Sequence, residues 1–204
     1  GGARTLAAAV VFTRRRALLV RDPETAGERS VVDPVKCLST DWSPSRVQSL
    51  LGRSLFDGAS LGTIRFHDPR VRDFLAAQWL QDRFSQGCPI ETVKELLCAE
   101  FPDGLVVREE MESVLAWVAC GDSYLSQEAR TWVLKAPPEL FFSQGDPGCL
   151  PIDYRRQLLD AYIDRCTGCD YSGTATNPES LARFAENAFD PDLNRIAADS
   201  TLGL

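Results

Sequence analysis

The sequence predicts a mainly α-helical protein that contains one short β-hairpin. Apolar residues recur at helical spacing in most of the chain, and no strand pattern stands out from residue 85 onward. The one stretch with β-strand character, residues 55–66, is interrupted by Asp57-Gly58 and Gly62, as in a hairpin. Several segments begin with a capping side chain followed by proline, a pair typical of helix starts: Asp33-Pro34, Ser43-Pro44, Asp68-Pro69, Asn177-Pro178 and Asp190-Pro191.

Residues 1–84 are expected to form a winged-helix-like domain. An alanine-rich segment at 3–20 predicts a first helix, a short second helix begins at Asp33-Pro34, and a third runs from Ser43-Pro44 to about Arg53. The hairpin and one more helix follow. Helix, helix, hairpin and helix in this order are typical of a winged-helix arrangement.

The helix after the hairpin begins beside the only histidine of the chain, His67. Asp68 is placed to cap the first turn of this helix, and Val71, Phe74, Leu75 and Trp79 are spaced as one apolar face. The free amides and the dipole at a helix start favour an anion, and an imidazole there could donate a hydrogen bond to a phosphate oxygen. His67 is therefore the candidate binding residue, although an isolated histidine beside a strand is more often structural.

Residues 85–204 are expected to form an all-helical domain. Helices are predicted at 89–101, 107–120, 126–136, 151–166, 178–189 and 191–199, and Ser126 is the candidate cap of the third. Antiparallel helices of this length with short joins favour stacked, HEAT-like helix pairs, and an irregular helical bundle is the alternative. The pair Phe141-Phe142 would mark an interface if it is exposed.

Size and composition limit the class of protein. A chain of 204 residues is long enough for one or two domains, and a net charge of −7 argues against a nucleic-acid surface as the main role. No apolar run is long enough to span a membrane. The seven cysteines are odd in number, and Cys98 and Cys120 lie in apolar helical contexts, which favours a reducing, cytoplasmic location. Because the chain opens at Gly1 and its single methionine is Met111, we expect a piece of a longer protein.

The remaining motifs do not indicate a metal site or catalysis. Cys166 and Cys169 have the C-x-x-C spacing, but a zinc site needs a second such pair or two histidines, and a thioredoxin-like site needs a βαβ context. We expect two free thiols there and no metal. The chain contains no G-x-x-x-x-G-K-[ST] motif and no G-x-G-x-x-G after a strand. It therefore has no phosphate-binding loop of its own.

The segment around His67 resembles a known family. Phe66-His67 followed by Arg72-Asp73-Phe74-Leu75-Ala76-Ala77-Gln78-Trp79-Leu80 is similar to the end of the winged-helix module in NACHT-type STAND NTPases. Many of these proteins are signalling ATPases of innate immunity, including bacterial anti-phage defence. Their order is an effector, a nucleotide-binding NACHT core, a winged helix, and helical or repeat sensor domains.

The resemblance implies a role for one residue. In the family, the histidine at this position reaches the β-phosphate of bound ADP and helps to hold the closed, inactive form, and this role maps onto His67. Asp68-Pro69 departs from the family, in which a basic residue and Ser or Thr are usual. An acidic side chain at this place would repel phosphate unless capping turns its carboxylate away.

Two hypotheses follow for the function. In the first, the chain is a regulatory and sensor fragment of a STAND signalling ATPase. An upstream NACHT domain of that ATPase binds ADP or ATP, and downstream sensor repeats follow the fragment. The fragment alone is then not an enzyme and binds no cofactor of its own. In the second, the chain is a helical-repeat scaffold for protein–protein interaction without nucleotide linkage, and the His67 motif is a coincidence of capping. A winged-helix nucleic-acid binder is disfavoured by the acidic charge.

Overall fold

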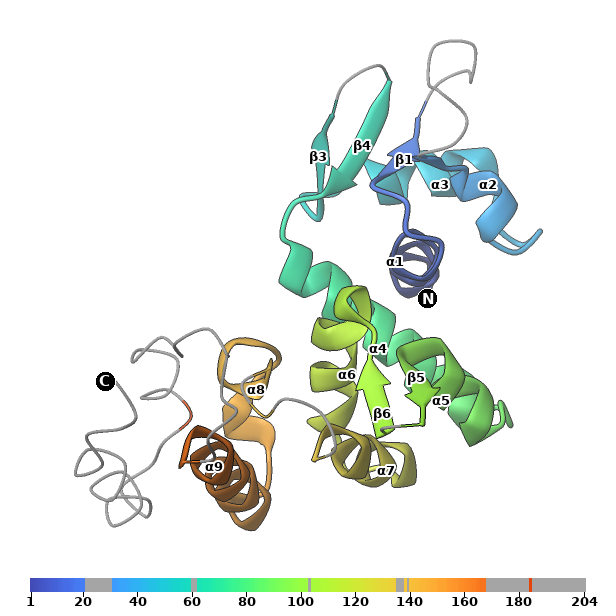
Figure 1. The fold of residues 1–204 in the computed structure, drawn as a ribbon. Helices are drawn as coiled ribbons and strands as arrows, with labels where there is room; N and C mark the ends of the chain where they lie inside the picture. Colours follow the sequence, from blue (N-terminus) through green and yellow to red (C-terminus); the bar gives the residue numbers. More distant parts are fainter. Residues whose placement is uncertain are drawn as a thin grey trace. The chain divides into compact units, whose positions relative to one another are not determined.

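The computed structural model describes residues 1–20, 31–59, 62–102, 104–134, 138, 140–167 and 184 of the chain. Over these residues the protein is mainly helical, with one sheet of four strands and one of two (Figure 1). The predicted mainly α-helical class is therefore confirmed. Within the described ranges, no helix has the length and apolar character needed to cross a membrane.

The chain divides into two compact units. Unit 1 comprises Gly1–Leu97 and Glu109–Val114, and unit 2 comprises Cys98–Arg108 and Leu115–Leu204. The domain limits expected from the sequence, residues 1–84 and 85–204, stay a prediction.

Unit 1 contains the four-stranded sheet. Its strands lie in the order β2-β1-β4-β3, with β1 parallel to β2 and antiparallel to β4, and with β3 and β4 forming an antiparallel hairpin. Figure 1 labels β3, β4 and β1 in this order. The elements are α1 (Gly2–Phe12), β1 (Ala17–Leu19), β2 (Val31–Val32), α2 (Pro34–Cys37), α3 (Pro44–Leu51), β3 (Phe56–Gly58), β4 (Thr63–Phe66), α4 (Pro69–Ser85), α5 (Ile90–Leu97) and the 3-10 helix η1 (Glu109–Met111).

The hairpin and three predicted helix starts are confirmed. The side chains of Asp33, Ser43 and Asp68 each accept a hydrogen bond from a backbone amide in the first turn of α2, α3 and α4. Each cap is followed by proline at the first helical position, where the missing N–H has no partner to lose. These signals are local, so the sequence alone is enough to place them.

The first predicted helix is too long. α1 ends at Phe12 rather than at residue 20, and Arg14 then adopts a positive φ of 55°, which interrupts helical geometry. Residues Ala17–Leu19 instead form β1 inside the sheet, where Leu18 is fully buried. A short apolar run has no period that separates helix from strand, and pairing with β2 and β4 decides the outcome.

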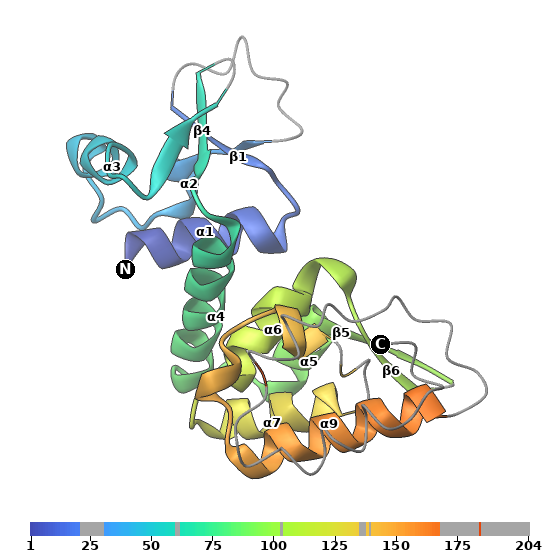
Figure 2. The same ribbon diagram turned by 90° about the vertical axis from the view of Figure 1, so that its left-hand side faces the viewer.

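The apolar face predicted for α4 is wrong at Val71 and Phe74, whereas Leu75 and Trp79 are half-buried and the Trp79 ring lies 5.9 Å from that of Phe12 in α1. Val71 and Phe74 are 38% and 39% exposed, while the buried residues of α4 are Asp73, Ala76, Ala77 and Leu80. Figure 2 shows α1 crossing α4, and α1 buries alanines as well. Small side chains on both helices allow a close approach, so the contact with α1 selects the alanine face of α4 over the face with larger side chains.

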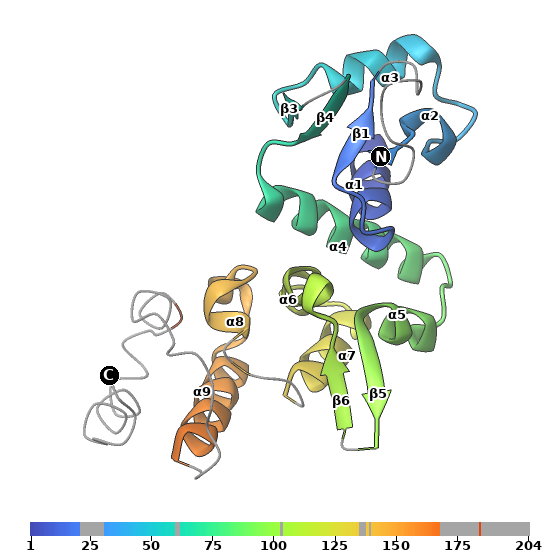
Figure 3. The ribbon, with the colours of Figure 1, turned by 45° about the horizontal axis from the view of Figure 1, so that its top comes forward.

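Unit 2 contains a second hairpin. β5 (Cys98–Phe101) and β6 (Gly104–Val107) pair antiparallel and lie side by side in Figure 3. The expectation of no strand after residue 85 is therefore wrong, and the helix predicted over 89–101 ends at Leu97. Pro102-Asp103-Gly104 between the strands is a turn signal in the sequence, and Gly104 has a positive φ of 136°, which glycine adopts without strain.

Helices complete unit 2 around an apolar core. They are α7 (Tyr124–Val133), α8 (Leu140–Ser143), the 3-10 helix η2 (Pro147–Cys149) and α9 (Ile152–Thr167), while α6 (Glu112–Ala119) runs from unit 1 into unit 2. The inward residues predicted for α7 and α9 are confirmed where they are described, since Ala129, Trp132, Val133, Leu158, Leu159, Tyr162 and Ile163 are all buried.

Two finer predictions in unit 2 are wrong. α7 begins before Ser126, because Ser123 is its cap and accepts a hydrogen bond of 3.1 Å from the Ser126 amide. Phe141 and Phe142 are buried in the core rather than exposed at an interface, and the Phe142 ring packs against the Phe184 ring at 4.8 Å. The helices predicted at 178–189 and 191–199 lie outside the described residues, apart from Phe184.

Candidate functional site

The β3–β4 hairpin places His67 directly after β4. The register pairs Phe56 with Phe66 and Asp57 with Arg65, and the amide of His67 continues the ladder by donating to the Leu55 carbonyl at 2.9 Å. Because side chains alternate along a strand, Phe66 faces inward and is buried, while Arg65 and His67 share the outer face. The packing of Phe56 against Phe66, with ring centroids 4.8 Å apart, holds this register.

The His67 ring is exposed and is paired with a carboxylate. Its side chain is 67% exposed, and its Nδ1 atom lies 2.7 Å from Oδ2 of Asp57 on the neighbouring strand. Within the described residues, Nε2 of His67 makes no hydrogen bond. The ring thus has one nitrogen fixed by the protein and one facing outward. It is not packed into the hydrophobic core.

Asp68 follows His67 but directs its carboxylate toward α4. Oδ1 accepts from the Arg70 amide at 2.8 Å, and Oδ2 lies 3.2 Å from the Arg70 guanidinium. The hydrogen bond from the Arg70 side chain is the main reason that the pKa of Asp68 is lowered. The capping that the sequence predicted is confirmed, and the negative charge of Asp68 is held beside the positive charge of Arg70.

This arrangement can bind an anion through a single histidine. The outward Nε2 atom can donate a hydrogen bond when it carries a proton, and Arg65 adds a positive charge on the same face of β4. No group of carboxylates, thiols and imidazoles that could hold a metal ion exists among the described residues. The polar groups of this site are thus the outward Nε2 atom of His67 and the guanidinium of Arg65.

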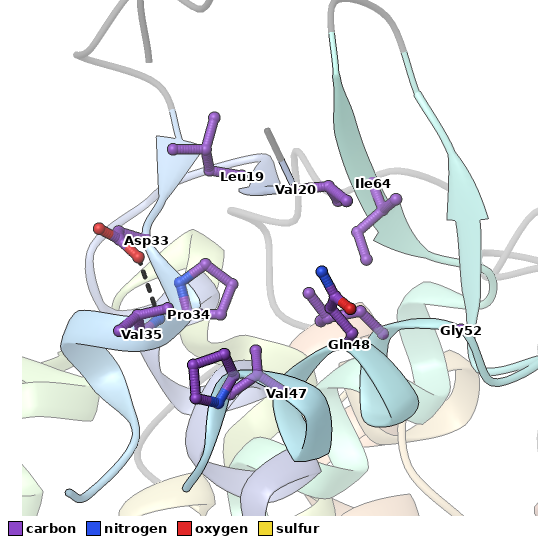
Figure 4. Close-up of a pocket in the computed structure, with 11 residues that line it drawn as sticks. Leu19, Val20, Asp33, Pro34, Val35, Val47, Gln48, Gly52 and Ile64 are labelled. Carbon is purple, nitrogen blue, oxygen red and sulfur yellow. Dashed lines mark hydrogen bonds between the residues drawn. The ribbon is translucent and has the colours of Figure 1, made fainter. Parts of the chain in front are cut away.

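A second feature of unit 1 is an open apolar groove of about 670 Å³. Leu19, Val20 and Ile64 line it from the sheet side, and Pro34 and Val47 line it from α2 and α3 (Figure 4). Val20 and Val35 are 44% and 63% exposed at this groove. Sequence reasoning did not find the groove, because its walls come from four separated segments.

Five cysteines are free thiols: Cys37, Cys88, Cys98, Cys120 and Cys149. In unit 2, the Sγ atoms of Cys120 and Cys149 donate to the backbone carbonyl and the carboxylate of Asp146, each at 3.2 Å. Burial raises the pKa of Cys120 to about 11, and the hydrogen bond to Asp146 is the main cause of a raised pKa at Cys149. Neither thiol is activated. Cys169 of the C-x-x-C pair lies outside the described residues.

Sequence reasoning missed Asp57 as the partner of His67. In the sequence, Asp57 is recognisable only as a turn residue of the hairpin. The strand register identifies it, because the pairing of Asp57 with Arg65 brings the Asp57 carboxylate within reach of the His67 ring, which lies two residues after Arg65 and just beyond β4.

Comparison with protein-family models, with curated proteins and with solved structures finds no match to this chain.

Proposed function

We propose that this chain is a regulatory and sensor part of a NACHT-type STAND signalling ATPase. On this proposal residues 1–84 form a winged-helix module, and His67 contributes to a nucleotide site whose catalytic residues lie in a separate NACHT domain. Residues 85–204 begin a helical, HEAT-like or irregular, sensor arm. The chain itself is not an enzyme, and the ATPase is cytoplasmic and acts in innate immunity or anti-phage defence.

The topology of unit 1 supports the winged-helix part of the proposal. A helix, a strand, two helices and a two-stranded wing follow one another, and the first strand pairs with the second strand of the wing, since β1 lies beside β4. β2, parallel to β1, adds a fourth strand at the edge. This is the order of a winged helix with one additional strand.

The observation that carries the proposal is the exposed ring of His67 at the end of the wing and the start of α4. A histidine that contacts a nucleotide in a neighbouring domain must present a ring nitrogen outward, and Nε2 meets this requirement. The sequence raised the objection that the acidic side chain of Asp68 would repel a phosphate at His67. This objection is weaker in the structure, because the Asp68 carboxylate caps α4 and is paired with Arg70.

The surface next to His67 supports contact with another domain. Val71 and Phe74 are three residues apart in the first turns of α4, which begins just after His67, so they share one face of the helix, and both are more than a third exposed. Apolar side chains beside a polar group are typical of an interface. On this proposal, the NACHT domain covers this face when the protein is closed.

His67 is one of several contacts that hold the inactive form. A hydrogen bond to a charged group contributes about 1.5–3 kcal/mol, whereas moving a two-state switch from 1:99 to 99:1 needs about 5.5 kcal/mol. Domain packing and residues of the NACHT domain therefore supply the remainder.

Two measurements test the proposal. In the longer protein that it supposes, His67→Ala should weaken ADP retention and raise basal activity, and wild-type ADP affinity and basal activity in that variant would refute the role of His67. The 204-residue chain alone should show negligible heat in calorimetric titrations with ADP or ATP. Micromolar binding there would contradict a site completed by another domain.

The groove in unit 1 favours a second candidate, a protein-interaction scaffold without nucleotide linkage. Its exposed valines, Val20 and Val35, would suit apolar side chains of a protein partner. The recovery of the complete reading frame separates the two functions, since the first requires a phosphate-binding loop upstream and the second does not.

A further inference from the structure

We infer that Asp57 is a positioning residue that makes the phosphate contact of His67 depend on a proton: Nε2 of His67 can donate to a phosphate oxygen only when the ring is a charged imidazolium. The inference rests on the proposed function of His67 and adds the protonation state in which its ring would bind phosphate.

The argument begins at Nδ1 of His67, which lies 2.7 Å from Oδ2 of Asp57. An ionised carboxylate can only accept hydrogen bonds, so a hydrogen bond at this distance requires the proton to be on Nδ1. A neutral imidazole carries one N–H, and its other nitrogen is then an acceptor. With Nδ1 protonated, Nε2 of the neutral ring presents a lone pair, which a phosphate oxygen repels.

Protonation of the ring changes this contact. The imidazolium donates from both nitrogens, so Nδ1 keeps its bond to Asp57 while Nε2 donates to phosphate. Both bonds are then charge-assisted. The proton comes from solvent and returns to solvent when the phosphate leaves, and no covalent bond changes. Binding of the diphosphate to the neutral ring is therefore coupled to the uptake of one proton.

The other charged groups near the ring do not replace this proton. Arg65 lies on the same face of β4, and its guanidinium charge does not change in the pH range in which histidine titrates. Asp68 and Arg70, at the start of α4, are paired with each other at 3.2 Å. Among the charged side chains on β3, β4 and the first turn of α4, Asp57 is thus the one that contacts the ring.

The first test uses the 204-residue chain, in which His67 is the only histidine. In a ¹⁵N-labelled sample, the chemical shifts of the two ring nitrogens above the titration of the ring report which nitrogen carries the proton. We expect Nδ1–H in the wild type. In Asp57→Asn, the amide can donate to Nδ1, so Nε2–H should gain population. Asp41→Asn, an exposed residue without contact to the ring, should match the wild type.

The result is decisive in either direction. A neutral wild-type ring with its proton mainly on Nε2 would overturn the inference, whatever the ligand. Unchanged amide shifts along the β3–β4 hairpin show that the Asp57→Asn variant has kept its fold, and Asp57→Ala gives a second variant that lacks any acceptor.

The second test measures ADP affinity of the longer protein between pH 7 and 9, where the terminal phosphate is already ionised. Wild-type affinity should fall with rising pH, by up to about tenfold per pH unit. Asp57→Asn should make the ADP affinity depend less on pH, because the neutral His67 ring in this variant can still donate from Nε2. Asp41→Asn should show the pH dependence of the wild type.

The two proposals fail in different ways. If His67→Ala weakens ADP binding but the wild-type affinity does not change with pH, the proton linkage is wrong and the role of His67 stands. If His67→Ala leaves ADP affinity unchanged, the proposed function of His67 is wrong, and the proton position measured in the shorter chain still tests the action of Asp57.

Discussion

Replacement of Leu18 by alanine should destabilise unit 1 strongly. Leu18 is fully buried in β1, where it pairs with Val32 of β2 and with Ile64 of β4. Truncation of a buried leucine costs about 2–5 kcal/mol, from lost burial and the cavity that remains. With an m-value of about 2 kcal/mol per molar urea, a cost of about 3 kcal/mol lowers the unfolding midpoint by about 1.5 M.

The neighbouring Val20 provides the matched control. It lies two residues along the chain, just after β1, and is 44% exposed. Val20→Ala should therefore change the free energy of unfolding by about 0.5 kcal/mol or less. The two variants are compared by urea denaturation followed by circular dichroism. Equal midpoints for Leu18→Ala and Val20→Ala would refute the placement of residues 17–19 inside the sheet.

Three further predictions concern the cap of α4, the Cys120 thiol and the Tyr154 hydroxyl. Asp68→Asn should keep the cap of α4 and lower the thermal midpoint less than Asp68→Ala does, because asparagine and aspartate cap equally well, and equal midpoints for the two variants in calorimetry would contradict a capping role for Asp68. Cys120 should resist iodoacetamide at pH 8 in the folded protein, since a pKa of about 11 leaves about one thiolate in a thousand, and rapid native-state labelling found by mass spectrometry would contradict this. Tyr154→Phe should lower the free energy of unfolding by about 1 kcal/mol, because the Tyr154 hydroxyl donates to the Arg130 carbonyl at 2.8 Å. An unchanged midpoint in urea denaturation would show that this hydrogen bond does not stabilise the fold.

The features that the sequence predicts well are local ones. A capping side chain acts on amides two or three residues away, so Asp33, Ser43 and Asp68 identify their helices without knowledge of the fold. The β3–β4 hairpin is likewise indicated by its own turn residues. These signals also place His67 between a strand and a helix, which is the part of the candidate site that could be predicted.

The features that the sequence misses depend on partners far along the chain. The local pattern of Ala17–Leu19 predicts the end of a helix, but these residues form a strand because they pair with β2 and β4. α4 has apolar residues on more than one side, and only the contact with α1 decides that Ala76 and Ala77 are buried while Phe74 stays partly exposed. The Asp57–His67 pair requires the strand register, which a residue pattern does not supply.

The most direct test of the central claim compares ADP with AMP in the longer protein. If His67 contacts the β-phosphate, His67→Ala should weaken ADP binding by about 10- to 150-fold, the equivalent of one charge-assisted hydrogen bond. AMP has no β-phosphate, so its affinity should be the same in the variant and the wild type. An equal loss for both nucleotides, or no loss for ADP, would contradict a phosphate contact by His67.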